Sequence, residues 1–116
     1  MKEIVTTRDA SSQQENAVAK ALGGKRTANS GATAFSKGDV VAGAVLVECK
    51  TKMTECSSFS IQKSWLDTLE EERRGMGKRA AALAFSFDVG KKNYYVIDER
   101  QMKRLVELLN EEAAVG

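Results

Sequence analysis

Residues 39–50 limit the possible folds of this chain more than any other stretch, because their pattern is typical of a β-hairpin. Side chains within 44–50 alternate with the two-residue period of a strand. Such a strand turns Glu48 and Lys50 to one face and the apolar residues between them to the other. We therefore expect a sheet with one face that packs in the core and one that carries a carboxylate beside an ammonium group.

The first half of this hairpin supplies a second carboxylate. Asp39 starts the short run 39–41, and the tight reversal at Ala42-Gly43 would return its carboxylate to a position beside Glu48. Two hard oxygen ligands and Lys50 would then share one pocket. Because Mg²⁺ binds carboxylate oxygens and activates water, this set predicts metal-dependent hydrolysis of phosphodiesters.

The composition removes several other kinds of catalytic site. The 116 residues include no His, which excludes serine-hydrolase triads and histidine-ligated zinc sites. Cys49 and Cys56 have no spacing typical of a metal clip or a disulfide framework, so we expect reduced thiols. No apolar run approaches the roughly 20 residues that span a bilayer, and the N-terminus has no apolar signal-peptide core. We expect one cytoplasmic domain over 1–116 without membrane contact.

The remaining sequence predicts helices before, between and after two hairpins. The expected elements are a helix over 11–22, a polar loop over 25–37, the hairpin, a helix over 60–75 capped by Ser58 or Ser60, strands over 80–87 and 94–98, and a helix over 99–113. The predicted order is α-β-β-α-β-β-α, an α/β fold. The apolar stripe of the last helix would be buried against the sheet, against a partner subunit, or against both.

Several short motifs occur in a characteristic order over about residues 12–100. They are Glu15 on the opening helix, Ser30-Gly31 in the loop, Gly38-Asp39, Glu48-Cys49-Lys50, and Ser60 to Leu66 on the next helix. Together they resemble the PD-(D/E)XK nuclease superfamily, with Gly38 where its signature has proline. Within that superfamily they look most like the archaeal-type Holliday junction resolvases and their phage relatives.

The resemblance implies a restriction-endonuclease-like mixed β-sheet flanked by helices, and a nuclease that cleaves DNA with Mg²⁺, for which Mn²⁺ substitutes. It also implies branched DNA as the substrate and a homodimer, since symmetric cleavage of a four-way junction needs two active sites. Residue by residue, it implies that Asp39, Glu48 and the Cys49 carbonyl bind the metal ion. Lys50 would lie beside the attacking water, with Glu15 as an accessory acid and possible further ligand.

Basic and polar residues around the hairpin are candidates for contacts with DNA phosphates. The net charge is only +2, so their distribution matters more than their total. Loops and helix ends that flank the proposed pocket would orient a duplex through its backbone. The candidates are Lys25, Arg26, Ser30, Lys37, Lys52, Gln62 and Lys63.

Other interpretations of the same residues stay open at this stage. Glu48 and Lys50 taken alone also fit an ion pair on an ordinary amphipathic strand. Trp65, in a stripe with neighbouring apolar residues, is expected in the core, and 67–74 as a solvated helix face. Alternative functions are a nicking or repair nuclease acting on ends, flaps or mismatches, a non-catalytic DNA-binding subunit, and a nuclease that acts on RNA.

Overall fold

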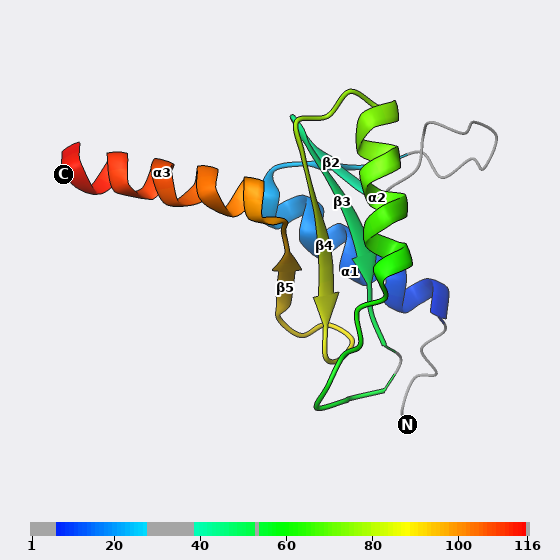
Figure 1. Cartoon of the computed structure of the whole chain (residues 1–116). Coiled ribbons are helices and arrows are strands. Elements are labelled where there is room, and N and C mark those ends of the chain that lie inside the picture. The colour runs from blue at the N-terminus through cyan, green and yellow to red at the C-terminus, as the bar shows by residue number, and fades with distance from the viewer. Residues whose placement is uncertain (1–6, 28–38, 53, 116) are drawn as a thin grey trace.

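The structure is a computed structural model that describes residues 7–27, 39–52 and 54–115. Its elements follow one another along the chain as shown in Figure 1. They are α1 (Thr7–Leu22), β1 (Lys25–Arg26), β2 (Val40–Ala42), β3 (Val45–Lys50), α2 (Lys63–Gly75), β4 (Ala80–Ser86), β5 (Asn93–Val96) and α3 (Glu99–Val115). Among the described helices, none is long and apolar enough to cross a membrane.

The strands form one five-stranded mixed sheet in the order β1-β2-β3-β4-β5. Only β3 and β4 are parallel, and α2 connects them, as a crossover between parallel strands requires. The other neighbours are antiparallel. Helices α1 and α2 lie on opposite faces of the sheet (Figure 1). The predicted mixed sheet flanked by helices is therefore confirmed.

The hairpin of β2 and β3 forms where the sequence predicts it. The strands are joined by a two-residue loop whose first residue, Gly43, has a φ of 58°. Glycine adopts this left-handed conformation without the steric cost that a Cβ adds, and tight hairpin loops favour it at this position. The loop sets the register, with Val41 opposite Leu46.

The core has two layers because the sheet is covered on both faces. Under α1, Val18 packs against Val40, Val47 and Ala84. On the other face, Leu69 of α2 anchors a cluster with Leu46, Ala81 and Leu83, and half-buried Trp65, Leu66 and Phe85 surround it. Strand β4 is nearly continuous in apolar residues because it contributes to both layers. The predicted core position of Trp65 is confirmed.

Two details of the predicted organisation are wrong. The order α-β-β-α-β-β-α omits β1, which the sequence analysis placed in a polar loop. Lys25 and Arg26 pair with β2 through the backbone, and a two-residue strand has too few side chains to show a period. The second wrong detail is where two helices start, since α1 begins at Thr7 rather than at residue 11 and neither Ser58 nor Ser60 is the cap of α2. Gln62 is the N-cap residue, with extended backbone and no capping bond from its side chain.

Candidate active site

Strand β3 presents Glu48 and Lys50 on the face covered by α2, as the alternation predicts. Lys50 Nζ lies 3.8 Å from Glu48 Oε1 and 4.6 Å from the centroid of the Trp65 ring. The two charged side chains are 24% and 31% exposed, so both remain accessible from solvent. The ammonium group is therefore held between a carboxylate and an aromatic face, both of which favour a cation.

These side chains open into a pocket of about 130 Å³ between β3 and α2. Its walls include a second carboxylate, Glu72, which the sequence analysis assigned to a solvated helix face. A signal for Glu72 exists in the sequence, because it lies three residues after Leu69 and seven after Trp65 and so shares their buried stripe. The lining residues are Glu48, Lys50, Ser64, Trp65, Thr68, Leu69 and Glu72.

Asp39 is bonded to the same hairpin just before β2 begins. Its backbone N–H donates to the Val47 carbonyl over 3.0 Å, and its Oδ2 accepts the Cys49 N–H over 2.7 Å. The carboxylate is thus tied to β3 at the residue between Glu48 and Lys50. Burial raises the pKa of Asp39, whereas the Cys49 N–H and the charges of Lys50 and Arg26 lower it.

Helix α1, which brings Glu15 toward Asp39, is anchored to the sheet by the neighbouring residue Gln14. The preceding residue, Gln14, is buried and donates its side-chain amide to the Lys50 carbonyl at 2.8 Å, to the Ala84 carbonyl at 3.3 Å and to Asn93 Oδ1 at 3.1 Å. This set of bonds fixes α1 across three strands. The sequence analysis did not identify Gln14, since only tertiary contacts reveal its role.

Glu15 is paired with Arg26 of β1. The Arg26 Nε lies 3.2 Å from Glu15 Oε1, and the guanidinium also donates to Asn16 and Ser12 on α1. Burial and the neighbouring Asp39 raise the pKa of Glu15, and Arg26 lowers it. Arg26, predicted to bind DNA, is therefore engaged mainly with α1 in this structure.

Carboxylates outnumber cations around Glu48. Burial and the charges of Asp39, Glu72 and Glu15 together raise the pKa of Glu48 to about 7, against the opposing effect of Lys50. Burial and the charges of Asp39, Glu15 and Glu48 raise the pKa of the Cys49 thiol, which favours its uncharged form. A group of partly buried like charges is relieved by binding either protons or a metal cation.

The donor atoms here suit a magnesium ion. The carboxylates of Asp39 and Glu48 and the carbonyl of Cys49 are hard oxygen ligands, and Mg²⁺ keeps several waters, so two or three protein ligands suffice. In the part of the chain that the structure describes, no group of three or more acidic, cysteine or histidine side chains could hold a metal ion. A shell built on this hairpin would therefore combine two carboxylates with a backbone oxygen and water.

The candidate DNA contacts are distributed over two regions. Gln62 is the N-cap residue of α2 and Lys63 its first residue, directly before Ser64, which lines the pocket with Lys50. Their contact with DNA stays a prediction. The Lys63 ammonium is also 2.8 Å from Asp67. Lys25 and Lys52 are exposed on β1 and after β3. Ser30 and Lys37 lie outside the described residues.

An aromatic surface with lysines extends from the pocket across the sheet. Lys50, Phe85 and Tyr94 are direct cross-strand neighbours in one row over β3, β4 and β5. The Lys52 ammonium lies 5.5 Å from the centroid of the Phe59 ring, and the Lys92 ammonium 5.4 Å from that of Tyr94. Cations beside partly exposed rings in this arrangement resemble the surfaces on which nucleic acid backbones and bases bind.

Comparisons with protein-family models, with curated proteins and with solved structures returned no match for this chain. Membership of the PD-(D/E)XK superfamily therefore stays a prediction from the sequence motifs. The geometry shows that Glu48 and Lys50 line one pocket and that Asp39 is bonded to Cys49, the residue between them.

Proposed function

We propose that this protein is a magnesium-dependent endonuclease that hydrolyses phosphodiester bonds in DNA. The observation that carries the proposal is the shared position of Glu48 and Lys50 in one pocket, with Asp39 bonded to the backbone of Cys49 between them. A structural ion pair needs only one acid and one base. Burial, together with the neighbouring acids, raises the pKa of Glu48 to about 7, and this excess of partly buried carboxylates favours a site for a cation.

Asp39, Glu48 and the Cys49 carbonyl would hold the magnesium ion, and Glu15 is a possible further ligand. When bound, the ion supplies polarisation of the scissile phosphate and a lowered pKa for water at neutral pH. The protein contributes the rigid hairpin that keeps these oxygens in place. The bond from the Cys49 N–H fixes one oxygen of Asp39, which leaves the other free of that constraint.

Lys50 would act on the phosphate directly. Its ammonium is held by Glu48 and the Trp65 ring, so little side-chain freedom is lost when a phosphate binds. A fixed positive charge at this point offsets the negative charge that develops on the phosphoryl oxygens and orients the attacking water. The pocket face of α2 limits access of bulk solvent to this charge.

The substrate is proposed to be branched DNA, cleaved by a homodimer that carries two active sites. The resemblance to Holliday junction resolvases supports this choice, and the row of aromatic side chains with lysines supports binding of nucleic acid in general. Mn²⁺ is expected to replace Mg²⁺, since both prefer oxygen ligands. Cleavage of flaps or nicking of duplex would keep the chemistry and change only the substrate.

The experiment that tests this function incubates a labelled four-way junction and a matched linear duplex with the protein, with Mg²⁺ or with chelator. Wild type is compared with Lys50→Ala and with Lys20→Ala, which removes an exposed lysine of α1. We expect paired cuts in the junction that disappear with chelator and with Lys50→Ala but persist with Lys20→Ala. Metal-dependent cutting of both substrates would remove the junction preference, and tight binding without cutting would favour a non-catalytic DNA-binding subunit.

A further inference from the structure

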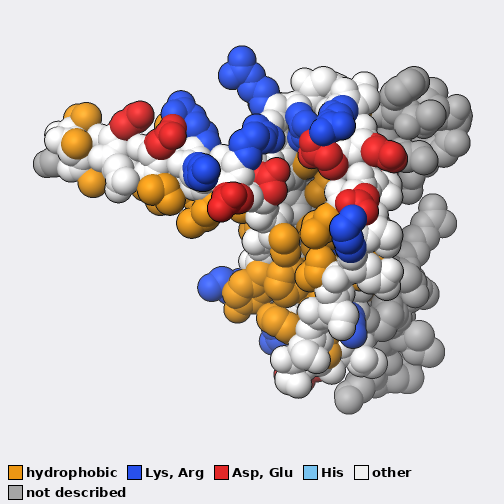
Figure 2. All heavy atoms as spheres, viewed as in Figure 1, with side chains coloured by type: hydrophobic (Ala, Val, Ile, Leu, Met, Phe, Trp, Pro, Cys, Tyr) orange, Lys and Arg blue, Asp and Glu red, His pale blue; other side chains and the backbone are white. Residues whose placement is uncertain are grey.

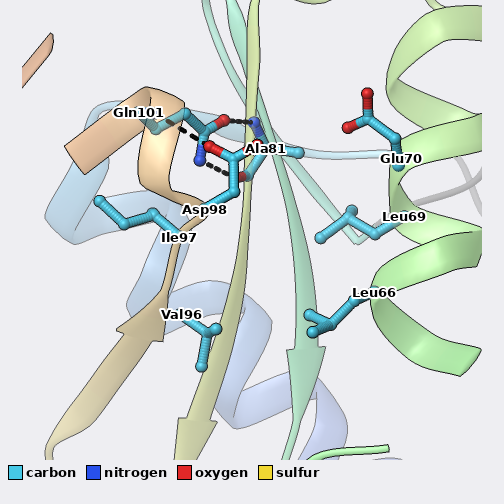
Figure 3. Close-up of a pocket in the computed structure, with 8 residues that line it drawn as sticks. All are labelled: Leu66, Leu69, Glu70, Ala81, Val96, Ile97, Asp98 and Gln101. Atoms are coloured by element: carbon cyan, nitrogen blue, oxygen red, sulfur yellow. Dashed lines mark hydrogen bonds between the residues drawn. The ribbon is translucent and has the colours of Figure 1, made fainter. Parts of the chain in front are cut away.

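Among the residues that the structure describes, helix α3 is attached to the globule at its base. Gln101 exchanges two hydrogen bonds with the backbone of Ala81 on β4, at 2.5 and 2.6 Å (Figure 3). Arg100 donates to the Arg79 carbonyl at 3.0 Å. No residue of α3 is buried, and the helix projects from the sheet along its whole length (Figure 1). The sequence left open whether α3 packs on the sheet; it does not.

The exposed helix carries an apolar face of large side chains. Met102, Leu105, Val106 and Leu109 recur at intervals of three and four residues, and each is between 41% and 54% exposed. Most of the stability of a helix in a protein comes from packing of its amphipathic face rather than from helix propensity. The apolar face of α3 therefore needs a covering surface, and the residues that the structure describes in one copy of the chain do not supply it.

An apolar groove continues this face at the base of α3. It has a volume of about 220 Å³. Leu66 and Leu69 extend from α2 toward Val96 across β4 (Figure 3). In Figure 2 the apolar side chains along one edge of α3 lead into the apolar surface between α3 and α2. The helix and the globule thus form the two sides of one open corner. A contiguous exposed apolar surface of this kind marks an interaction site.

The charges of α3 indicate what covers it. Residues 99–104 hold three basic side chains and one acidic, whereas residues 107–112 hold three acidic side chains and no basic one. Two α3 helices side by side in the same direction would place like charges together. In opposite directions, the basic half of each meets the acidic half of the other, which favours that pairing. The charged side chains are Glu99, Arg100, Lys103, Arg104, Glu107, Glu111 and Glu112.

We propose that the apolar face of α3 and the adjoining groove bind a second copy of this chain, with the two α3 helices antiparallel about a two-fold axis. The contact is self-complementary, because each copy offers the same helix and the same corner, and such contacts close as dimers. The acidic end of each helix then lies near the basic base of the other, where Arg79, Arg100 and Lys103 gather. The inference requires no DNA and no metal, so it can fail while the proposed hydrolysis stands; it shares with the proposed function only the homodimer, and a monomer would remove the paired cleavage of a junction.

The mass of the full-length chain in solution, measured by sedimentation over a concentration series without DNA or metal, tests the proposal. We expect a dimer of the 12.6 kDa chain. Val106→Glu introduces a charge into the apolar face and should weaken dimerisation by about a hundredfold or more. Ala17→Glu adds the same charge at an exposed position of α1 and should leave dimerisation unchanged.

Charge reversal tests the direction of the helices and guards against misfolded variants. One variant carries Lys103→Glu with Arg104→Glu, and the other Glu111→Lys with Glu112→Lys. Each alone should dimerise at least about tenfold more weakly, because like charges then face each other, and mixing the two should restore a dimer. A wild type that stays monomeric, a dimer insensitive to Val106→Glu, or charge variants that self-associate as wild type does would overturn the proposal.

Discussion

The pocket beside β3 and the projecting helix α3 depart from the usual partition of side chains in opposite directions. In the pocket, Glu48 is a partly buried acid surrounded by other acids. On α3, Leu109 and its apolar neighbours are exposed to solvent. Burial of charge and exposure of apolar surface both cost free energy in the isolated chain. The comparison teaches that both regions are incomplete alone and that they require different kinds of partner, a cation for one and an apolar surface for the other.

Removing Glu48, the central acid of the pocket, should have the largest effect of the changes considered for the two regions. Glu48→Gln keeps the shape of the side chain but removes a metal-binding charge, so we expect single-turnover cleavage to slow on the order of a thousandfold. Magnesium binding, followed by calorimetry, should weaken in parallel. The matched control is Glu71→Gln, at an exposed position of α2. Cleavage that survives Glu48→Gln within a few-fold would remove Glu48 from the proposed site.

Glu48→Gln should also change how the free energy of unfolding depends on pH, which measures the cost of the partly buried acid in the pocket. The pKa of Glu48 rises from its ordinary value of 4.5 to about 7 in the folded protein, so the folded state binds a proton that the unfolded state has already lost. The free energy of unfolding of the wild type should therefore fall as pH rises from 4.5 to about 7 and stay low above that range. In Glu48→Gln, the free energy of unfolding should not show this fall, because the amide does not titrate.

Urea unfolding in chelator measures the difference between the two proteins. Below pH 4.5 their dependence on pH should be similar, and above pH 7 the variant should gain on the order of 3 kcal/mol relative to wild type. Asp39 and Glu15 also have raised pKa values, but they are present in both proteins. Saturating Mg²⁺ above pH 7 should stabilise the wild type more than the variant. A difference that does not change with pH would show that burial of Glu48 carries no such cost.

Gln14 bonds α1 to the sheet and Gln101 bonds α3 to it, so replacing each glutamine measures how firmly that helix is attached. Gln14→Ala leaves the carbonyls of Lys50 and Ala84 without the donor that links α1 to the sheet, which should cost about 2 kcal/mol of unfolding free energy. Gln101→Ala removes the bonds between α3 and Ala81 and should cost about 1 kcal/mol, because α3 contributes little packing. Equal costs, measured by urea unfolding, would contradict this ranking.

Hydrogen exchange should show the smallest effect, and it addresses α3 alone. Amide protection along residues 102–115 should rise between dilute and concentrated protein, because a second copy covers the helix only at high concentration. Protection of α1, which packs on the opposite face of the sheet from the proposed contact, should not change. Equal protection of both helices at every concentration would mean that α3 needs no partner.

The parts of the site that the sequence could predict are the local ones. Alternation over 44–50 and the glycine after Ala42 specify which side chains share a face, and the structure agrees for Glu48 and Lys50. Glu72 was missed because a helix acid was assumed to face water, although its spacing from Leu69 places it on the buried side.

Other features depend on contacts that no local pattern contains. Residues between β3 and α2 are held by the distant Phe87 carbonyl, which accepts both the Cys56 N–H and its thiol, so serine propensities alone misplace the start of α2. The position of α3 could not be predicted either. Its period establishes that one face needs cover, and only the surroundings in three dimensions show that the sheet does not provide it.

Because Asp39 accepts a bond from the backbone N–H of Cys49, its position does not depend on which side chain residue 49 carries. Every amino acid except proline offers the same N–H, while the thiol itself points into the layer under α1 and serves only as packing. Descendants of this chain could therefore replace Cys49 with other small apolar residues and keep Asp39 in position. The register between β2 and β3 must be kept, however, because a slip of one residue would turn Glu48 and Lys50 toward α1.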